Sequence, residues 1–231
     1  NKAEGIISYT SLLYIPEMKP FDLFHVDRSP KVKLYSNRVF ITETLDNVLP
    51  RWLRFVNGVL DTSDLNLNVS REMLQHSPGL RRISKALKKK IIGELKKKKE
   101  KNEEVFNKFW KEFGAVLKEG IYEDPDHKVD LLSLSKFKSS KGEDEKFLPQ
   151  YVDGMHKKQK QIFYIAADSL DQATKSPHLE AFKSKDIEVL FFTDPIDTFW
   201  LSTQDEFDGK KFVSITQGSL DLSDFDEKGS D

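Results

Sequence analysis

The feature that most constrains the fold is a long helical pattern in the middle of the chain. Apolar residues recur there every three or four positions and lysines fill most of the remaining positions, which is typical of a helix with one buried face. The apolar positions are Leu80, Ile83, Leu87, Ile91 and Leu95. A second such pattern predicts a helix from about Glu103 to Lys118, ended by Gly120. Together these helices separate one strand-rich region from another.

The region before the helices contains two strand-like segments. Residues 8–15 are rich in β-branched and aromatic side chains, and residues 31–42 alternate apolar and polar positions, so each segment predicts a strand. A bulge is expected near residues 36–37 of the second strand. After Pro50, apolar residues recur at helical spacing, which predicts a helix over residues 49–60.

In the region after the helices, the spacing of apolar residues changes. A helical pattern at 129–134 comes first, and short apolar segments at 162–166, 189–192 and 212–213 then alternate with predicted helices at 169–175, 178–183 and 195–202. This alternation indicates a small αβα unit. We therefore predict a mixed α/β (α+β) fold. Its parts are a larger αβα unit at 1–100, a helical connector at 101–134, a smaller αβα unit at 135–218 and an acidic linker at 219–231.

Composition narrows the function classes. The 231 residues include no cysteine, which excludes a disulfide scaffold, a thiolate metal site and a cysteine nucleophile. No apolar run approaches the roughly 18 residues that a membrane span needs. The net charge of −1 hides opposed blocks, because residues 81–101 hold eleven basic and two acidic residues, whereas 219–231 hold five acidic residues and one lysine. The basic block favours a solvated helix face or a surface for an acidic partner, and phosphate binding is the weaker alternative.

Signatures of a self-contained enzyme are absent from the sequence. Neither a phosphate-binding glycine loop, nor a nucleophile elbow, nor a zinc-binding His-Glu-x-x-His motif is present. The five histidines lie more than 20 residues apart, so no metal site is expected. Asp194 and Asp197 flank Pro195 and could act as acid and base, but the simpler interpretation is that Asp194 caps a helix that Pro195 begins.

Two short segments carry candidate functional residues. Arg71 follows a turn at a predicted helix start, where backbone N–H groups favour an anion, and Gln75 lies one turn later on the same face. The pair could present a cationic fork and an amide to a phosphate, although an ordinary ion pair of Arg71 would look the same in sequence. In the other segment, Phe21, Leu23 and Phe24 place large apolar groups in a loop, where they either join the core or form an adhesive surface.

The chain resembles the middle domain of the heat-shock protein 90 chaperones, particularly the bacterial and mitochondrial branches of that family. The resemblance covers roughly residues 9–215. It is carried by Tyr9–Pro16, Val32–Tyr35, Arg38–Ile41, Leu53–Val56, Asn68–Gln75, Phe113–Gly114, Lys118–Gly120, Asp194–Asp197 and Glu206–Lys210. The segment Asn68–Gln75 is the most specific of these. Asn66 departs from the proline usual in the family, which implies a less rigid entry to this segment.

The resemblance implies a role in ATP hydrolysis that this chain performs only together with other domains. ATP with Mg²⁺ would bind a separate N-terminal domain, and Arg71 and Gln75 would reach its γ-phosphate, with Asn68 and Ser70 shaping the loop. Phe40 would help to dock the nucleotide domain. The fragment alone is therefore expected to have negligible ATPase activity.

The resemblance also implies partners. Phe21, Leu23 and Phe24 would form an exposed loop that touches client proteins. Dimerisation would use a C-terminal domain, co-chaperones are possible, and neither a membrane nor a nucleic acid is expected as partner. The location would be the cytoplasm in a bacterium or the mitochondrial matrix in a eukaryote. The alternative is a non-enzymatic interaction module whose lysine-rich helix binds acidic partners or nucleic acid, with an affinity that falls steeply with salt.

Overall fold

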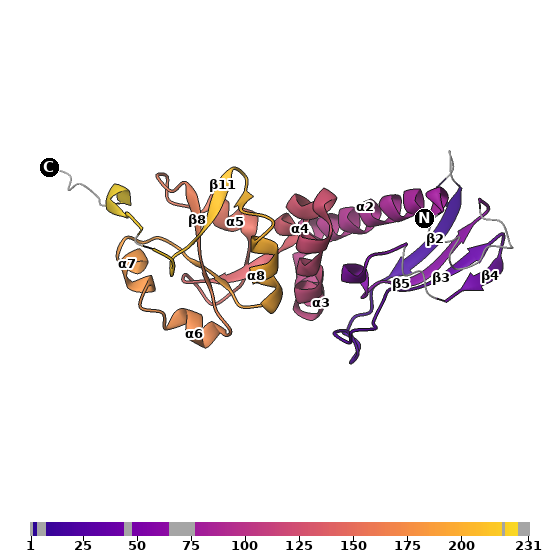
Figure 1. The fold of residues 1–231 in the computed structure, drawn as a ribbon, viewed down its shortest axis with the longest axis horizontal. Helices are drawn as coiled ribbons and strands as arrows, with labels where there is room; N and C mark the ends of the chain where they lie inside the picture. The colour runs from indigo at the N-terminus through magenta and orange to yellow at the C-terminus, as the bar shows by residue number, and fades with distance from the viewer. Residues whose placement is uncertain (1, 4–7, 44–47, 65–76, 219, 226–231) are drawn as a thin grey trace. The chain divides into compact units, whose positions relative to one another are not determined.

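The chain folds into two compact units, Asn1–Leu117 and Lys118–Asp231. The computed structural model describes residues 2–3, 8–43, 48–64, 77–218 and 220–225 (Figure 1). Strands and helices occur in both units, which confirms the predicted mixed α/β class. The predicted connector at 101–134 is divided between the units, because the boundary follows Leu117.

The first unit is built on a five-stranded sheet with the order β1-β2-β5-β3-β4. These strands are β1 (Lys2–Ala3), β2 (Tyr9–Tyr14), β3 (Lys31–Ser36), β4 (Val39–Thr42) and β5 (Asn57–Thr62). Strands β3 and β5 pair in parallel, whereas the other neighbours are antiparallel. The predicted strand at 8–15 is thereby confirmed as β2.

Two sequence predictions in this unit were wrong. Residues 31–42 form a hairpin of two strands rather than one bulged strand, because Asn37 and Arg38 adopt positive φ angles of 49° and 66° and reverse the chain. Residues 49–60 form a short 3₁₀ turn, η1 (Arg51–Leu53), followed by the central strand β5 rather than a helix. Pairing with β2 on one side and β3 on the other outweighs the helical spacing of the apolar residues.

The two central helices were predicted correctly in type. Helix α2 (Pro78–Lys101) begins after the N-cap Ser77, and its buried residues include the whole predicted stripe from Leu80 to Leu95. Helix α3 (Glu103–Glu123) continues past Gly120, where the sequence predicted its end. In the first unit, Phe55 packs against the rings of Phe109 and Phe113 of α3, with centroid distances of 5.4 and 5.3 Å.

The second unit is built on a six-stranded sheet with the order β10-β11-β8-β9-β6-β7. Its strands are β6 (Lys136–Ser139), β7 (Lys146–Phe147), β8 (Gln161–Ala166), β9 (Leu190–Phe192), β10 (Glu206–Phe207) and β11 (Lys210–Ser214). Its helical segments after α3 are η2 (Pro125–His127), α4 (Lys128–Leu134), α5 (Leu148–Asp153), α6 (Leu170–Thr174), α7 (Leu179–Ser184), α8 (Pro195–Leu201) and η3 (Ser223–Phe225). The predicted strands and helices between 129 and 213 are confirmed, and α5, β6, β7 and β10 are additional.

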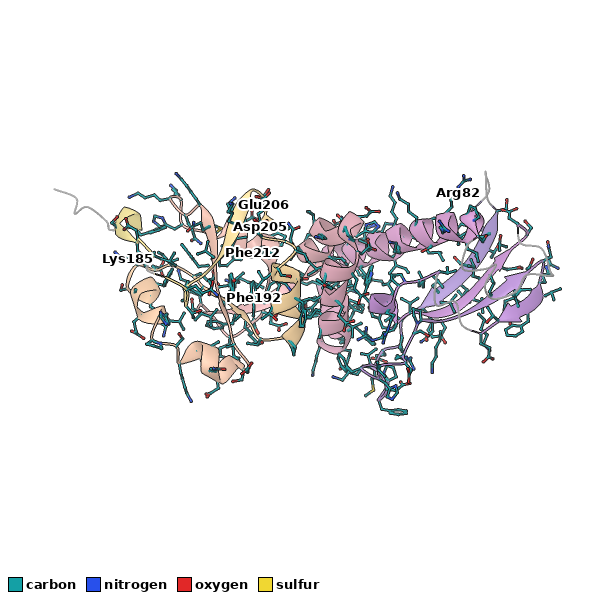
Figure 2. All side chains as sticks on the ribbon, in the orientation of Figure 1. Arg82, Lys185, Phe192, Asp205, Glu206 and Phe212 are labelled. Atoms are coloured by element: carbon teal, nitrogen blue, oxygen red, sulfur yellow. The ribbon has the colours of Figure 1, made fainter. Side chains whose placement is uncertain are left out.

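Alternate residues of β8 face two different layers. Phe163 and Ile165 join a buried cluster with residues of α6 and α7. On the opposite face, Tyr164 stacks on Phe192, which packs edge-on against Trp200 of α8 at 5.3 Å. Phe192 and Phe212 of this second cluster are labelled in Figure 2, and Figure 1 shows α6 and α7 on one side of β8 and α8 on the other. The sheet therefore lies between two helical layers.

Candidate functional site

The segment with the four predicted phosphate-site residues lies outside the described residues. Asn68, Ser70, Arg71 and Gln75 all fall within residues 65–76. The described residues before and after it make side-chain hydrogen bonds of their own. At the end of β5, the Thr62 hydroxyl donates to the carbonyl of Ser8 at 2.9 Å and accepts from the Asp64 N–H at 3.2 Å. These bonds hold the described residues that follow β5, the central strand of the sheet.

The far end of that segment is the start of α2. The hydroxyl of Ser77 accepts a hydrogen bond from the Leu80 N–H at 3.4 Å, and Pro78 occupies the first turn, where its missing N–H costs nothing. The nearest described elements before and after the predicted catalytic residues are thus a strand and a long capped helix.

Phe40, the predicted docking residue, lies on the edge strand β4. Its side chain is half-exposed and meets the ring of Tyr35 edge-on at a centroid distance of 5.7 Å. The turn before it is stabilised by a hydrogen bond from the Arg38 N–H to a carboxylate oxygen of Asp61 at 3.2 Å. Phe40 is therefore accessible to another domain, and its docking role stays a prediction.

The predicted apolar loop divides into exposed and buried residues. Phe21 is fully exposed and Phe24 is 61% exposed, but Leu23 is completely buried, so the expectation that Leu23 is exposed was wrong. Leu23 is an anchor, because its side chain packs into the core and its carbonyl accepts a 2.7 Å hydrogen bond from Nε of Arg54. Met18 and Val26, which were not singled out in the sequence, are also exposed, at 75% and 70%.

An apolar groove of about 680 Å³ lies in the first unit between β2, α2 and α3. Its lining includes Leu12, Tyr14, Ile91, Leu95 and Phe109. Such a lining suits hydrophobic packing and carries no nucleophile–base pair. Of the predicted site residues that the structure describes, Phe21, Leu23, Phe24 and Phe40, none lines it.

The lysine-rich helix pairs part of its charge within itself. A carboxylate oxygen of Glu94 lies 3.0 Å from the ammonium groups of both Lys90 and Lys97. Hydrogen bonds from these two lysines lower the pKa of Glu94 to about 2. Burial lowers the pKa of Lys99. Most of the other charged side chains outside the buried stripe are exposed to solvent. Binding of an acidic partner there stays a prediction.

The carboxylates that flank Pro195 belong to a buried ion cluster in the second unit. Asp194 is the N-cap residue of α8, as predicted, and its N–H donates to Asp197 at 3.1 Å. The Lys118 ammonium lies 2.5 Å from Asp194 and 2.7 Å from Asp197, and the Asp197 carboxylate also accepts a hydrogen bond from the indole N–H of Trp200 at 2.9 Å. Burial alone would lower the pKa of Lys118, but the two carboxylates outweigh it and raise that pKa.

This cluster was missed in the sequence because Lys118 is 76 residues from the nearer carboxylate. Its geometry argues against the acid–base alternative, since both carboxylates are engaged by a cation. Among the described residues, no group of three or more His, Asp or Glu side chains is placed to hold a metal ion. The described helices include none that is both long and apolar enough to cross a membrane.

Comparisons with known proteins identify relatives over nearly the whole chain. Residues 1–231 match the family model described as Hsp90 protein. The chain is 53% identical over 222 residues to the chaperone protein HtpG of Paramagnetospirillum magneticum and 47% identical over 227 residues to that of Roseobacter denitrificans. These matches cover 96% and 98% of the chain, but only 36% and 37% of the relatives, so the chain spans about a third of their length.

A solved structure supports the same relationship. The chain is similar to the middle domain of a putative heat shock protein of Plasmodium falciparum, with a TM-score of 0.80 and 32% sequence identity. The similarity covers 94% of this chain and 86% of that one. Both the sequence and the fold therefore match one family along almost the whole length.

Proposed function

Because the chain belongs to the Hsp90 protein family, we propose that it works as the middle domain of an ATP-dependent chaperone and completes an ATPase site formed with another domain. The observation that carries this proposal is the match to HtpG chaperones over 96% or more of the chain, together with the fold of a solved middle domain. The chain contributes to hydrolysis in the longer protein and has negligible ATPase activity alone.

In the proposed mechanism, Arg71 supplies positive charge to the transferring phosphoryl group. ATP and Mg²⁺ bind the N-terminal domain, and closure of the domains brings the guanidinium of Arg71 and the amide of Gln75 to the γ-phosphate. A guanidinium can donate two parallel hydrogen bonds to phosphate oxygens, and its charge opposes the negative charge that develops in the transition state. Asn68 and Ser70 shape the loop that carries these two residues.

The first test is replacement of Arg71 by alanine in the longer protein that contains this chain. We expect kcat for ATP hydrolysis to fall by about 10²-fold or more with nucleotide affinity largely kept, because the interaction exists only in the transition state. Steady-state kinetics and nucleotide titration measure the two quantities. Arg82→Ala is the matched control, since Arg82 is an exposed arginine of α2 (Figure 2) and should leave kcat unchanged. Normal turnover in the Arg71 variant would exclude this role.

The proposal extends to partners and place of action. Phe40 helps to dock the nucleotide domain from the edge of the first sheet, and the exposed Phe21 and Phe24 contact client proteins. The longer protein forms a homodimer through a C-terminal domain and can work with co-chaperones. In a bacterium it acts in the cytoplasm, where the family's bacterial members work on unfolded polypeptides; in a eukaryote, the mitochondrial matrix takes that place.

A further inference from the structure

The loop that displays Phe21 is tightly folded by its own backbone. The N–H groups of Leu23, His25 and Arg28 donate hydrogen bonds of 3.0, 2.9 and 3.0 Å to carbonyls three residues earlier. These are successive tight turns, and Pro16 and Pro30 flank them with restricted φ angles. At the base of the loop, the Lys19 N–H donates to a carboxylate oxygen of Glu112 in α3 at 3.2 Å.

Two buried arginines fasten this folded loop to the first unit. Nη1 of Arg28 donates to both carboxylate oxygens of Asp22, at 2.9 and 2.8 Å, although only 5% of the Arg28 side chain is exposed. Arg54, also buried, donates to the Leu23 carbonyl, and its guanidinium lies 6.0 Å from the ring centre of Phe24. Charge-assisted hydrogen bonds in such sheltered positions are stronger than those at an open surface.

The charge state of Asp22 supports the strength of this contact. Partial desolvation alone would raise the pKa of Asp22, but the hydrogen bonds and charge of Arg28 outweigh it, so the pKa is lowered from its ordinary value. Asp22 therefore stays ionised at neutral pH, and Arg28 keeps a charged partner. Leu23 adds an apolar anchor between the two exposed aromatic residues.

The result is a loop that holds apolar side chains away from the core. A free loop with so many large apolar groups would tend to collapse onto the protein, because burial of apolar surface is favourable. Here Phe21 remains fully exposed while the residue two positions later is completely buried. Fixing such an arrangement before binding removes an ordering cost that the complex would otherwise have to meet.

We infer that Asp22, Arg28 and Arg54 are positioning residues, which hold Met18, Phe21, Phe24 and Val26 as a preformed platform for apolar segments of unfolded polypeptide. The inference rests on the proposed function, because it assumes that this loop contacts clients. The platform residues touch the client, whereas the positioning residues act through them by restricting the loop.

The experiment compares variants of this chain in binding a permanently unfolded probe, fluorescently labelled reduced and carboxymethylated α-lactalbumin. Phe21→Ser tests the contact itself and should weaken binding at least tenfold. Asp22→Asn is nearly isosteric but removes the charge, and Arg28→Met removes the cation. We expect each to weaken binding about 5- to 10-fold. Asp171→Asn, which breaks an exposed ion pair with Lys175 on α6, is the matched control and should not change binding.

A second measurement separates loop order from general stability. Hydrogen exchange of the Leu23, His25 and Arg28 amides should accelerate about tenfold in Asp22→Asn, whereas amides of β5 should keep their protection. Asp22→Asn also keeps the test decisive if Arg28→Met fails to fold. Binding equal to the parent chain in Asp22→Asn, with Phe21→Ser impaired, would overturn the positioning role and leave the client contact intact. Unchanged binding in Phe21→Ser would overturn both.

Discussion

At the scale of single residues, the approach of two strands depends on one missing side chain. Gly58 lies in β5 opposite Leu13 of β2 and has a φ angle of +152°, a conformation that other residues rarely adopt. A Cβ atom at this position would lie 2.1 Å from the backbone oxygen of Leu12, which is far inside van der Waals contact. Close pairing of β2 and β5 therefore requires glycine.

Gly58→Ala should destabilise the chain by more than about 1 kcal/mol, because both the φ angle and the neighbouring backbone oppose a side chain. Urea unfolding at neutral pH measures the change. Gly93→Ala is the matched control, since nothing lies within 4 Å of a Cβ added at that position of α2. Alanine there should stabilise the helix by up to about 1 kcal/mol. Equal effects of the two substitutions would contradict the steric argument.

At the scale of elements, α2 has a buried apolar stripe and an exposed side rich in lysines. The lysine side chains would repel one another without acidic residues between them. The five residues of its apolar stripe and Ile92 are buried in the first unit. On the exposed side, Glu94 lies between Lys90 and Lys97, one helical turn away in each direction. Glu94 thus reduces repulsion in the most basic part of the helix.

Glu94→Gln should lower the urea midpoint of unfolding slightly at pH 7, and the effect should depend on pH in a defined way. The hydrogen bonds from Lys90 and Lys97 lower the folded-state pKa of Glu94 from 4.5 to about 2. A lowered carboxylate pKa stabilises the fold above the unfolded-state value and loses this effect as pH falls through the folded-state value. The difference from the parent chain should therefore be equal at pH 7 and pH 5.5 and smaller at pH 3.5. A difference that grows below pH 4.5 would contradict this assignment.

At the scale of the whole molecule, contacts between distant parts of the sequence complete each unit. In the second unit, Lys118 of α3 meets Asp194 and Asp197 at the start of α8, 76 and 79 residues later in the chain. The ammonium also lies 5.0 Å from the ring centre of Phe137. The buried ammonium of Lys118 in α3 thus contacts both β6 and the start of α8.

Lys118→Met should destabilise the second unit by about 3–5 kcal/mol, because it leaves the fully buried carboxylate of Asp197 without its cation. Thermal or urea unfolding reports the loss, followed by fluorescence in a Trp52→Phe/Trp110→Phe background in which Trp200, whose indole contacts Asp197, is the remaining tryptophan. Lys175→Met removes an exposed lysine at the C-cap of α6 that pairs with Asp171, and it should change stability by less than about 1 kcal/mol. A similar decrease in the free energy of unfolding in both variants would contradict the proposal that the buried ion cluster stabilises the second unit more than an exposed ion pair does.

Features that depend on local pattern could be predicted from the amino-acid sequence. The stripe from Leu80 to Leu95 predicted α2, alternation of strands and helices predicted the second unit, and the segment Asn68–Gln75 indicated the family through its residues alone. Helical periodicity and short motifs depend on neighbours along the chain, so they can be recognised without knowledge of the fold.

Contacts between residues that are far apart in the sequence can be identified only in the folded chain. Residues 57–60 belong to the segment 49–60 that was predicted as a helix but lie in strand β5, because β2 and β3 provide hydrogen-bonding partners on both sides. Leu23 and Phe21 are both large apolar residues of the same loop, but only Leu23 is buried. Its side chain packs into the core, and its carbonyl accepts a hydrogen bond from Arg54. Lys118 resembles any other lysine until the fold brings two carboxylates to it. In each case a partner far along the chain supplies the deciding free energy, and no local pattern records that partner.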